Sequence, residues 1–413
     1  MSAIGCGQAE TLAALRERRS GIGPVKYLET SLRDFPVGEV KLSNAELAAR
    51  TGAPETWPRT TLLSILALQE ALLQASLFPE GKAFSSAKKK ADASLCPEGK
   101  AFSSAKKKAD ATENAFPSGL MLVSGTTVGG MDLSERMYPA YSPWHSCGDS
   151  TDLAARFLGF GSATTLSTAC SSAANAFIYA ANLIRCGLAE RVVAGGAESL
   201  SDYHLNGFNS LMILDREWCR PFDATRAGLN LGEGAAFLVL ETEESALERG
   251  AKPIAVLSGW GNACDAFHQT ASSENGEGAF LAMSKALKVA CLKPSQIGYV
   301  NAHGTGTPNN DASESTALRR IFGDRIPPVS STKPYTGHTT SASGSIEAVF
   351  CLLALQHGFL PPQLNWKEAD PSCITPYCHS ERSEESCEES LRHILSNAFG
   401  FGGNDTSFIL SRV

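Results

Sequence analysis

The sequence predicts an α/β fold with mainly parallel sheets. Short apolar runs bounded by glycine or polar residues alternate with segments of helical period along most of the chain, as they do where strands and helices follow one another. With 43% hydrophobic residues over 413 positions, the chain has enough apolar material for a sizeable core. This length predicts two or three units, or one large duplicated unit.

Six short apolar runs are predicted as buried strands, because each is bounded by glycine or polar residues. They are Leu120–Ser124, Arg191–Ala194, Ala235–Leu240, Pro253–Leu257, Gly298–Asn301 and Thr406–Leu410. Helical patterns lie between them, near 60–75, 151–158, 170–186, 277–291, 311–321 and 344–357. The pattern that begins at Cys170 is apolar on more than one side, which predicts a buried central helix.

Charge and hydropathy exclude several classes of partner. With a net charge of -7, the protein is not expected to bind nucleic acid by electrostatic attraction over its whole surface. There is no apolar run near the length of about 18 residues that a spanning helix needs, and the first residues show no secretory signal. The twelve cysteines are scattered rather than paired along the sequence. This spacing favours reduced thiols, which are typical of cytoplasmic proteins. We therefore expect a cytoplasmic protein that binds neither nucleic acid nor membrane.

Two segments of biased composition resemble surface insertions. Residues 76–93 are repeated almost unchanged in 94–111, each copy with a lysine triplet. A basic binding arm is one interpretation, but we expect a solvated, duplicated insertion. Residues 379–390 are charged and serine-rich, which predicts an exposed loop. The cysteines and histidine at Cys373, Cys378, His379 and Cys387 match no usual zinc spacing, so no metal site is expected.

The first chemical candidate is Cys170, in the segment 165–173 (TLSTACSSA). Small residues surround it and allow a substrate to approach the sulfur. It opens the predicted central helix, whose positive end favours a thiolate, the nucleophilic form. A buried, inert cysteine is the alternative interpretation, because that is the usual state of a free cysteine.

Two histidines in glycine- and threonine-rich loops are the second observation. His303 follows a predicted strand in the segment YVNAHGTGTP, and α/β folds commonly place catalytic groups after strand ends. His338 ends the segment STKPYTGH, after Lys333 and before a predicted helix that contains Glu347. A single histidine is more often structural, but two histidines together with Cys170 favour thiol catalysis.

The last motif is the glycine- and phenylalanine-rich segment 396–404 (SNAFGFGGN). Such a backbone is flexible and allows close approach, so its N–H groups are candidates for an oxyanion hole beside two bulky side chains, Phe399 and Phe401. The glycine spacing does not match a dinucleotide-binding loop after a first strand, so no Rossmann-type cofactor site is expected.

Together these motifs resemble a β-ketoacyl-[acyl-carrier-protein] synthase of the elongating, Cys-His-His type in the thiolase-like superfamily. The resemblance rests on STACSSA at Cys170, NAHGTGT at His303, STKPYTGH with Lys333 and His338, and the terminal GFGGN. Shorter stretches that also match are AGGAE (194–198), RPFD (220–223), GEG (232–234) and DAFHQT (265–270). The chain departs from the family by opening at MSAIG, where a complete first strand is usual, and by a polar run, TTSASG, after His338.

The resemblance implies a thiolase-like αβαβα five-layer sandwich made of two similar halves. The expected halves are residues 1–250, with Cys170, and residues 251–413, with both histidines. The resemblance also implies a homodimer in which one sheet continues across the interface, and a two-fold dimer is the commonest oligomer.

The implied reaction is a decarboxylative Claisen condensation in fatty-acid or polyketide-like chain elongation. Cys170 takes the acyl chain while backbone N–H groups of Cys170 and Phe401 hold the oxyanion. His303 and His338 stabilise the enolate formed from malonyl carrier protein, and Lys333 pairs with Glu347; a solvated Lys333 is the alternative. Supporting roles are implied for Thr270, Thr305 and Thr307 at the pantetheine arm, for Phe401 as a gate with Phe399 behind it, and for Asp311 and Glu314 as structural support.

The implied partner is an acyl carrier protein, which delivers acyl and malonyl thioesters. Its phosphopantetheine arm belongs to the carrier, so no tightly bound cofactor is expected. Because carrier proteins are acidic, docking needs a local basic rim. Candidates for that rim are Arg59, Arg136, Arg216 and the lysine triplets.

Two alternatives stay open at this point. The same chemistry could serve a polyketide-like pathway, such as polyene pigment synthesis, because the polar run after His338 and the insertions are atypical. The chain could instead be a non-catalytic, chain-length-factor-like partner subunit of a heterodimeric ketosynthase. The presence of Cys170, His303 and His338 argues against the second alternative. The sequence does not indicate the acyl chain length.

Overall fold

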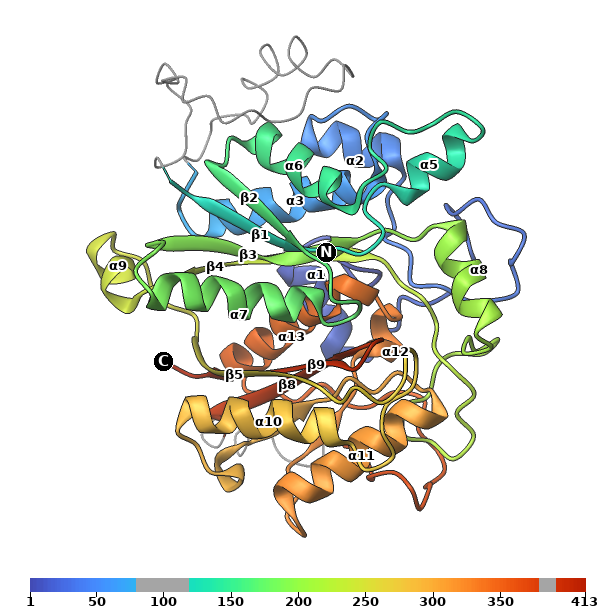
Figure 1. The fold of residues 1–413 in the computed structure, drawn as a ribbon, viewed down its shortest axis with the longest axis vertical. Helices are drawn as coiled ribbons and strands as arrows, with labels where there is room; N and C mark the ends of the chain where they lie inside the picture. Colours follow the sequence, from blue (N-terminus) through green and yellow to red (C-terminus); the bar gives the residue numbers. More distant parts are fainter. Residues whose placement is uncertain (79–118, 379–390) are drawn as a thin grey trace.

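The computed structural model describes residues 1–78, 119–378 and 391–413, and within them two sheets lie face to face with helices between and outside them (Figure 1). The N-terminal sheet has the order β2-β1-β3-β4 and the C-terminal sheet the order β5-β9-β8-β6-β7. In each sheet the strands are parallel apart from antiparallel pairs at β4 and β9. The strands are β1 (Met121–Gly125), β2 (Ser162–Leu166), β3 (Arg191–Glu198), β4 (Gly234–Glu241), β5 (Val256–Cys264), β6 (Tyr299–Asn301), β7 (Val329–Ser330), β8 (His393–Gly400) and β9 (Asn404–Ser411).

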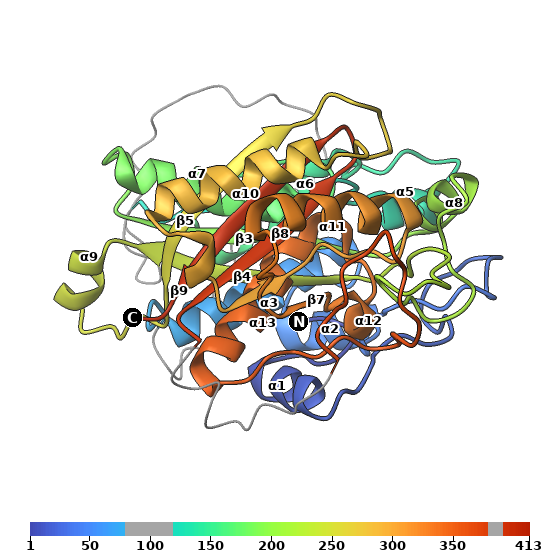
Figure 2. The same ribbon diagram turned by 90° about the horizontal axis from the view of Figure 1, so that it is seen from below.

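The helices form three layers around these sheets (Figures 1 and 2). Helices α3 and α6 cover the outer face of the N-terminal sheet, α7 and α13 lie between the sheets, and α10 and α11 cover the outer face of the C-terminal sheet. The α-helices are α1 (Gln8–Arg16), α2 (Asn44–Thr51), α3 (Arg59–Gln74), α5 (Met131–Met137), α6 (Cys147–Leu158), α7 (Ser172–Arg185), α8 (Asp202–Ser210), α9 (Glu243–Glu248), α10 (Glu277–Ala290), α11 (Pro308–Phe322), α12 (Lys333–Thr336) and α13 (Ser343–His357). The predicted α/β class is confirmed.

Helix α7 lies between the two sheets, as its apolar pattern predicts. Its alanines are buried, and Phe177 packs edge-on against Phe408 of β9 with ring centroids 5.6 Å apart. Glycine in β1 allows the start of the helix to come close, because a Cβ at Gly125 would lie only 2.5 Å from the backbone nitrogen of Ala173. This close packing fixes the helix end that follows Cys170.

Several sequence predictions need correction at the level of strands. Most of the run Pro253–Leu257 is a connecting segment, because β5 begins at Val256 and continues to Cys264. The glycines and polar residues of β5 interrupt the apolar pattern by which a strand is predicted. The segment 396–404 is not one loop, since β8 extends to Gly400 and only the turn 401–403 separates it from β9. Strands β2, β7 and β8 were not predicted.

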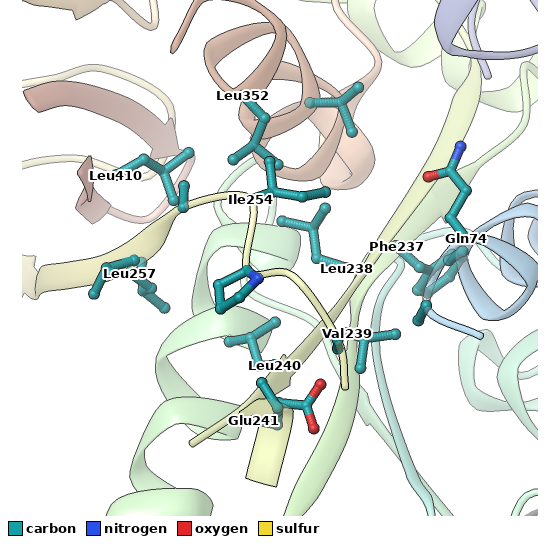
Figure 3. Close-up of a pocket in the computed structure, with 18 of the residues that line it drawn as sticks. Gln74, Phe237, Leu238, Val239, Leu240, Glu241, Ile254, Leu257, Leu352 and Leu410 are labelled. Carbon is teal, nitrogen blue, oxygen red and sulfur yellow. The ribbon is translucent and has the colours of Figure 1, made fainter. Parts of the chain in front are cut away.

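The two sheets differ by one strand. In the C-terminal sheet, β5 runs along the outer edge of β9. In the described part of the chain no strand runs along the outer edge of β4; only Met1 pairs there, its ammonium group donating to Ala235 O (2.9 Å) and its carbonyl accepting from Ala235 N (3.0 Å). A cavity of about 980 Å³ lies beside this edge (Figure 3).

This cavity is not the site of the chemistry. Its lining includes Leu238 and Leu240 of β4, Ile254 and Leu257, and Leu352 of α13 (Figure 3). It reaches Arg185 at the C-terminal end of α7, whereas Cys170 precedes the N-terminal end of the same helix. Because a helix of 14 residues is about 20 Å long, this part of the cavity is remote from Cys170.

Three further expectations can be placed on the structure. The division at residues 250 and 251 falls between α9 and β5 and stays a prediction. The duplicated segment and the 379–390 stretch lie outside the described residues, except that Leu77 and Phe78, at the start of the first copy, pack against the core beside α3. None of the described helices is long and apolar enough to cross a membrane.

Candidate active site

Cys170 lies in a tight turn between β2 and α7. The preceding residue, Ala169, has a left-handed backbone with φ of 52°. Two hydroxyl groups hold the turn: Ser171 Oγ donates to Thr168 O (2.8 Å) and Ser172 Oγ donates to Ala169 O (2.6 Å). The helix begins at Ser172, so Cys170 precedes its first turn rather than opening it as predicted.

The thiol of Cys170 faces an imidazole. His338 Nε2 lies 3.1 Å from Cys170 Sγ, although the two residues are 168 positions apart. The other ring nitrogen, Nδ1, lies 3.0 Å from Ser343 Oγ. Both Cys170 and His338 are buried, so the thiol and the imidazole form a contact shielded from bulk water.

The second histidine lies beside the first. The His303 and His338 rings are 5.2 Å apart between centroids and nearly perpendicular. Glu314 holds the backbone of this loop, because its carboxylate accepts from His303 N (2.9 Å) and Gly304 N (2.8 Å). Lys333 Nζ lies 3.3 Å from His303 Nδ1; an ammonium group can only donate, so Nδ1 accepts and the proton of the neutral ring is on Nε2.

Lys333 is buried and paired, so the alternative of a solvated lysine is wrong. Its side chain is 1% exposed, and Nζ lies 2.8 Å from Glu347 Oε1. Burial raises the pKa of Glu347 to about 7, against the opposing effect of Lys333. Burial, with Lys333 as the next cause, holds the pKa values of His303 and His338 well below 6.5, so both imidazoles are neutral at pH 7.

The expectation of a resting thiolate at Cys170 is wrong. Burial raises the pKa of Cys170 to about 12, although Lys333 and the backbone N–H groups of Cys170 and Phe401 act in the opposite direction. The thiol is therefore protonated at rest and needs a base at the moment of attack. His338 Nε2, at 3.1 Å, is in position to take that proton.

The turn between β8 and β9 closes over the thiol. A Cβ at Gly400 would lie 2.9 Å from Thr168 O and 3.0 Å from Cys170 N, so this position needs glycine. The next residue, Phe401, is half-buried and stacks on Phe208 of α8 with centroids 5.8 Å apart. Phe399 is buried in β8 and contacts the His303 ring at 5.7 Å.

The three threonines are not equivalent. Thr305 and Thr307 follow His303 in the same loop, and their hydroxyl oxygens lie 2.8 Å apart. Asp311 holds this loop by accepting from Thr305 N and Gly306 N. Thr270, by contrast, is exposed in a separate loop, and its backbone N–H donates to His268 Nδ1 (3.2 Å). That loop lies beside the turn 401–403, because Gln269 O accepts from Gly402 N (2.8 Å).

Three contacts of the site were missed from the sequence. Ser343 contacts His338, Phe208 stacks on Phe401, and Asn397 donates to Glu314 Oε1 (3.0 Å). Of these three contacts, only that of Ser343 had a signal in the sequence, which is the polar run after His338. Among residues 1–78, 119–378 and 391–413, no group of three His, Cys, Asp or Glu side chains is arranged to hold a metal ion.

Asp405, near this network, provides a pH test. It is 4% exposed, and burial, Asp265 and Glu314 raise its pKa from 3.8 to about 8. Between these values the folded chain keeps a proton that the unfolded chain has released, so stability falls as the pH rises, by at most about 1.4 kcal/mol per unit. Asp405→Asn removes this dependence. The melting temperature of Asp405→Asn relative to the parent should increase between pH 5 and pH 8, whereas Asp324→Asn, at an exposed position, should show no such trend.

Comparison with known proteins identifies the fold family. The β-ketoacyl synthase N-terminal domain matches residues 108–246, and the β-ketoacyl synthase C-terminal domain matches residues 254–367. Nodulation protein E of Rhizobium meliloti (strain 1021) is 34% identical over 97% of this chain and 94% of its own length. The chain belongs to the β-ketoacyl synthase family.

Other relatives agree with this assignment. The 3-oxoacyl-[acyl-carrier-protein] synthase 2 of Vibrio harveyi is 35% identical over 73% of this β-ketoacyl synthase and 77% of its own length. The solved structure of the ishigamide ketosynthase/chain length factor has a TM-score of 0.81 at 28% identity, covering 100% of this chain and 96% of that one. A β-ketoacyl synthase from Burkholderia phymatum STM815 has a TM-score of 0.77 at 28% identity, with coverage of 100% and 97%.

The predicted resemblance and the thiolase-like fold are confirmed by these matches. This β-ketoacyl synthase is an acyltransferase that carries out the condensation typical of ketosynthases.

Proposed function

We propose that Cys170 is the nucleophile of this synthase and that His338 is its base. The proton of Cys170 Sγ passes to His338 Nε2, and the thiolate attacks the carbonyl carbon of an acyl thioester. The N–H groups of Cys170 and Phe401, which act on the sulfur, hold the oxyanion of the tetrahedral intermediate. The carrier thiol then leaves with the proton from His338, and the acyl chain stays on Cys170.

In the second stage a malonyl thioester enters and loses CO₂. His303, with its Nε2–H set by Lys333, donates to the oxygen of the enolate that forms. His338 donates there as well once its ring proton has moved from Nδ1 to Nε2, the tautomer in which Nδ1 accepts from a neighbouring hydroxyl. The enolate carbon attacks the acyl carbon on Cys170, the new carbon–carbon bond forms and the bond from that carbon to Cys170 Sγ breaks. The released thiolate is then protonated by a proton taken up from water. Burial of both rings limits competing hydrolysis.

The contact between Cys170 Sγ and His338 Nε2, at 3.1 Å, carries this proposal. The direct test is mass spectrometry of the synthase after incubation with an acyl carrier protein loaded with an acyl chain. The expected result is one acyl group on the peptide that contains Cys170. An unmodified chain, or an adduct on another cysteine, contradicts the proposal, and an unmodified chain is what a non-catalytic partner subunit would give.

The partner that delivers both thioesters is an acyl carrier protein, through its phosphopantetheine arm. Thr305 and Thr307 support the arm, since their hydroxyl groups lie on the His303 loop; Asp311 and Glu314 hold that loop. Of the candidate docking residues, Arg59 is excluded because it is buried against Glu233. Arg136 and Arg216 have side chains 40% and 65% exposed and stay candidates.

We also propose a two-fold homodimer. In the described structure β2 pairs only with β1, which leaves its outer edge free. Pairing of this edge with its copy would continue the sheet across the interface. Because catalysis needs a reduced Cys170, we place the protein in the cytoplasm, where thiols stay reduced.

The pathway is fatty-acid or polyketide-like elongation. The relatives include both 3-oxoacyl-[acyl-carrier-protein] synthases and a structure named as a ketosynthase with its chain length factor, from Xenorhabdus doucetiae, at 29% identity. The second kind of relative supports a heterodimer as an alternative assembly. A competition assay between acyl carrier proteins with short, long and polyene chains separates the two pathways.

A further inference from the structure

We propose that Ser343 is a positioning residue that holds the proton of His338 on Nδ1, so that the Nε2 lone pair points at the thiol of Cys170. This inference rests on the proposed function, because it assigns how His338 becomes the base of the acylation stage.

The geometry places one hydroxyl group behind the ring. Ser343 Oγ lies 3.0 Å from His338 Nδ1, opposite the 3.1 Å contact between Nε2 and Cys170 Sγ. Ser343 is 1% exposed, and its hydroxyl also lies 3.3 Å from Thr339 Oγ1. A second hydroxyl therefore accepts the proton of Ser343 when Ser343 itself accepts from Nδ1.

The charges around His338 make this acceptor necessary. Lys333 and His204 both disfavour a positive charge on the ring, and the nearby His303 is neutral. When Nε2 takes the thiol proton, the resulting imidazolium carries a second N–H on Nδ1 that needs an acceptor. Among the hydrogen bonds of the described residues, only Ser343 Oγ meets Nδ1.

Ser343 differs in this respect from its neighbour Ser345 on α13. The hydroxyl of Ser345 donates to Ala342 O (3.0 Å), a local bond that serine commonly makes in the first turn of a helix. Ser345 is also fully buried, and its hydroxyl lies 3.5 Å from Gly196 O. Among the described residues no hydrogen bond joins it to His338. The pair offers a matched comparison, since both substitutions remove one buried hydroxyl from the same helical turn.

The test compares Ser343→Ala with Ser345→Ala in the full chain. Single-turnover acylation of Cys170 by an acyl carrier protein should slow about 10- to 100-fold in Ser343→Ala, the effect of one hydrogen bond to a charged group. Decarboxylation of malonyl carrier protein should not slow in the same way, because it uses the Nε2–H form of His338, and the loss of the acceptor at Nδ1 favours that form. Ser345→Ala should leave both rates unchanged, and Ser343→Thr, which keeps the hydroxyl, should restore acylation.

Nuclear magnetic resonance of ¹⁵N-labelled histidine gives a readout without turnover. The parent protein should show His338 protonated on Nδ1, and Ser343→Ala should shift the population toward Nε2–H. The inference is overturned by an Nε2–H form in the parent, or by an acylation rate in Ser343→Ala equal to that in Ser345→Ala. A parent protein that never acylates Cys170 would instead contradict the proposed function.

Discussion

Replacing Cys170 by alanine should reduce condensation by more than about 10⁴-fold, because no other group can hold the acyl chain as a thioester. Decarboxylation of malonyl carrier protein should persist, since the enolate is stabilised by His303 and His338, and both rings stay in place. Formation of β-ketoacyl product and release of CO₂, measured separately, check the two halves of the expectation.

The matched control is Cys219→Ala. Cys219 is also buried, and burial raises its pKa to about 12 as well. Its backbone N–H donates to Asn230, and among the described residues no hydrogen bond joins its sulfur to an imidazole. This variant should keep condensation within a few-fold of the parent. Retention of chain extension in Cys170→Ala, or equal loss in both variants, would show that the nucleophile is elsewhere or that the loss is structural.

Replacing Lys333 by methionine should have the second largest effect. Removing one partner of a buried ion pair leaves Glu347 without its cation, which costs about 3–5 kcal/mol. Because Glu347 then takes up a proton more readily, the loss of stability should be smaller at pH 6 than at pH 8. His303 also loses the donor at Nδ1, so decarboxylation should fall by about 10²-fold.

The double variant Lys333→Met, Glu347→Gln separates stability from catalysis. Without a buried charge, most of the lost unfolding free energy should return, as measured by chemical denaturation, while decarboxylation stays low because His303 still has no partner at Nδ1. Recovery of both quantities would show that Lys333 acts only on stability.

Local motifs revealed the chemistry of the site well. Cys170, His303, Lys333 and His338 each lie in short segments of small or polar residues, which marks them as candidates although no single segment decides their role. Their meeting depends on packing across 168 positions in the case of Cys170 and His338. From the sequence, the combination of two histidines with a cysteine favoured thiol catalysis, and the resemblance to a known family then assigned the segments to one site.

Other features depend on burial and could not be read from sequence patterns. Strand β8 was missed because Ser396 and Asn397 break its apolar run; both are buried, and Asn397 is satisfied by Glu314 and Ser407. The protonated resting state of Cys170 follows from full burial of the sulfur, which outweighs the nearby cation and N–H groups. The position of Cys170 before a helix gave the opposite expectation.

In the part of the chain that the structure describes, β4 has a neighbouring strand on one side only, so the two sheets should differ in local stability. Met1 occupies the N–H and C=O of Ala235, and by the alternation of an antiparallel ladder those of Phe237 and Val239 point the same way, toward the cavity. Their amide protons should therefore exchange with deuterium sooner than those of β9, which is flanked on both sides. On gradual heating, the hydrogen bonds at this edge of β4 should break first, and unfolding should spread through the N-terminal sheet. The part of the fold that carries the two histidines should stay folded longer.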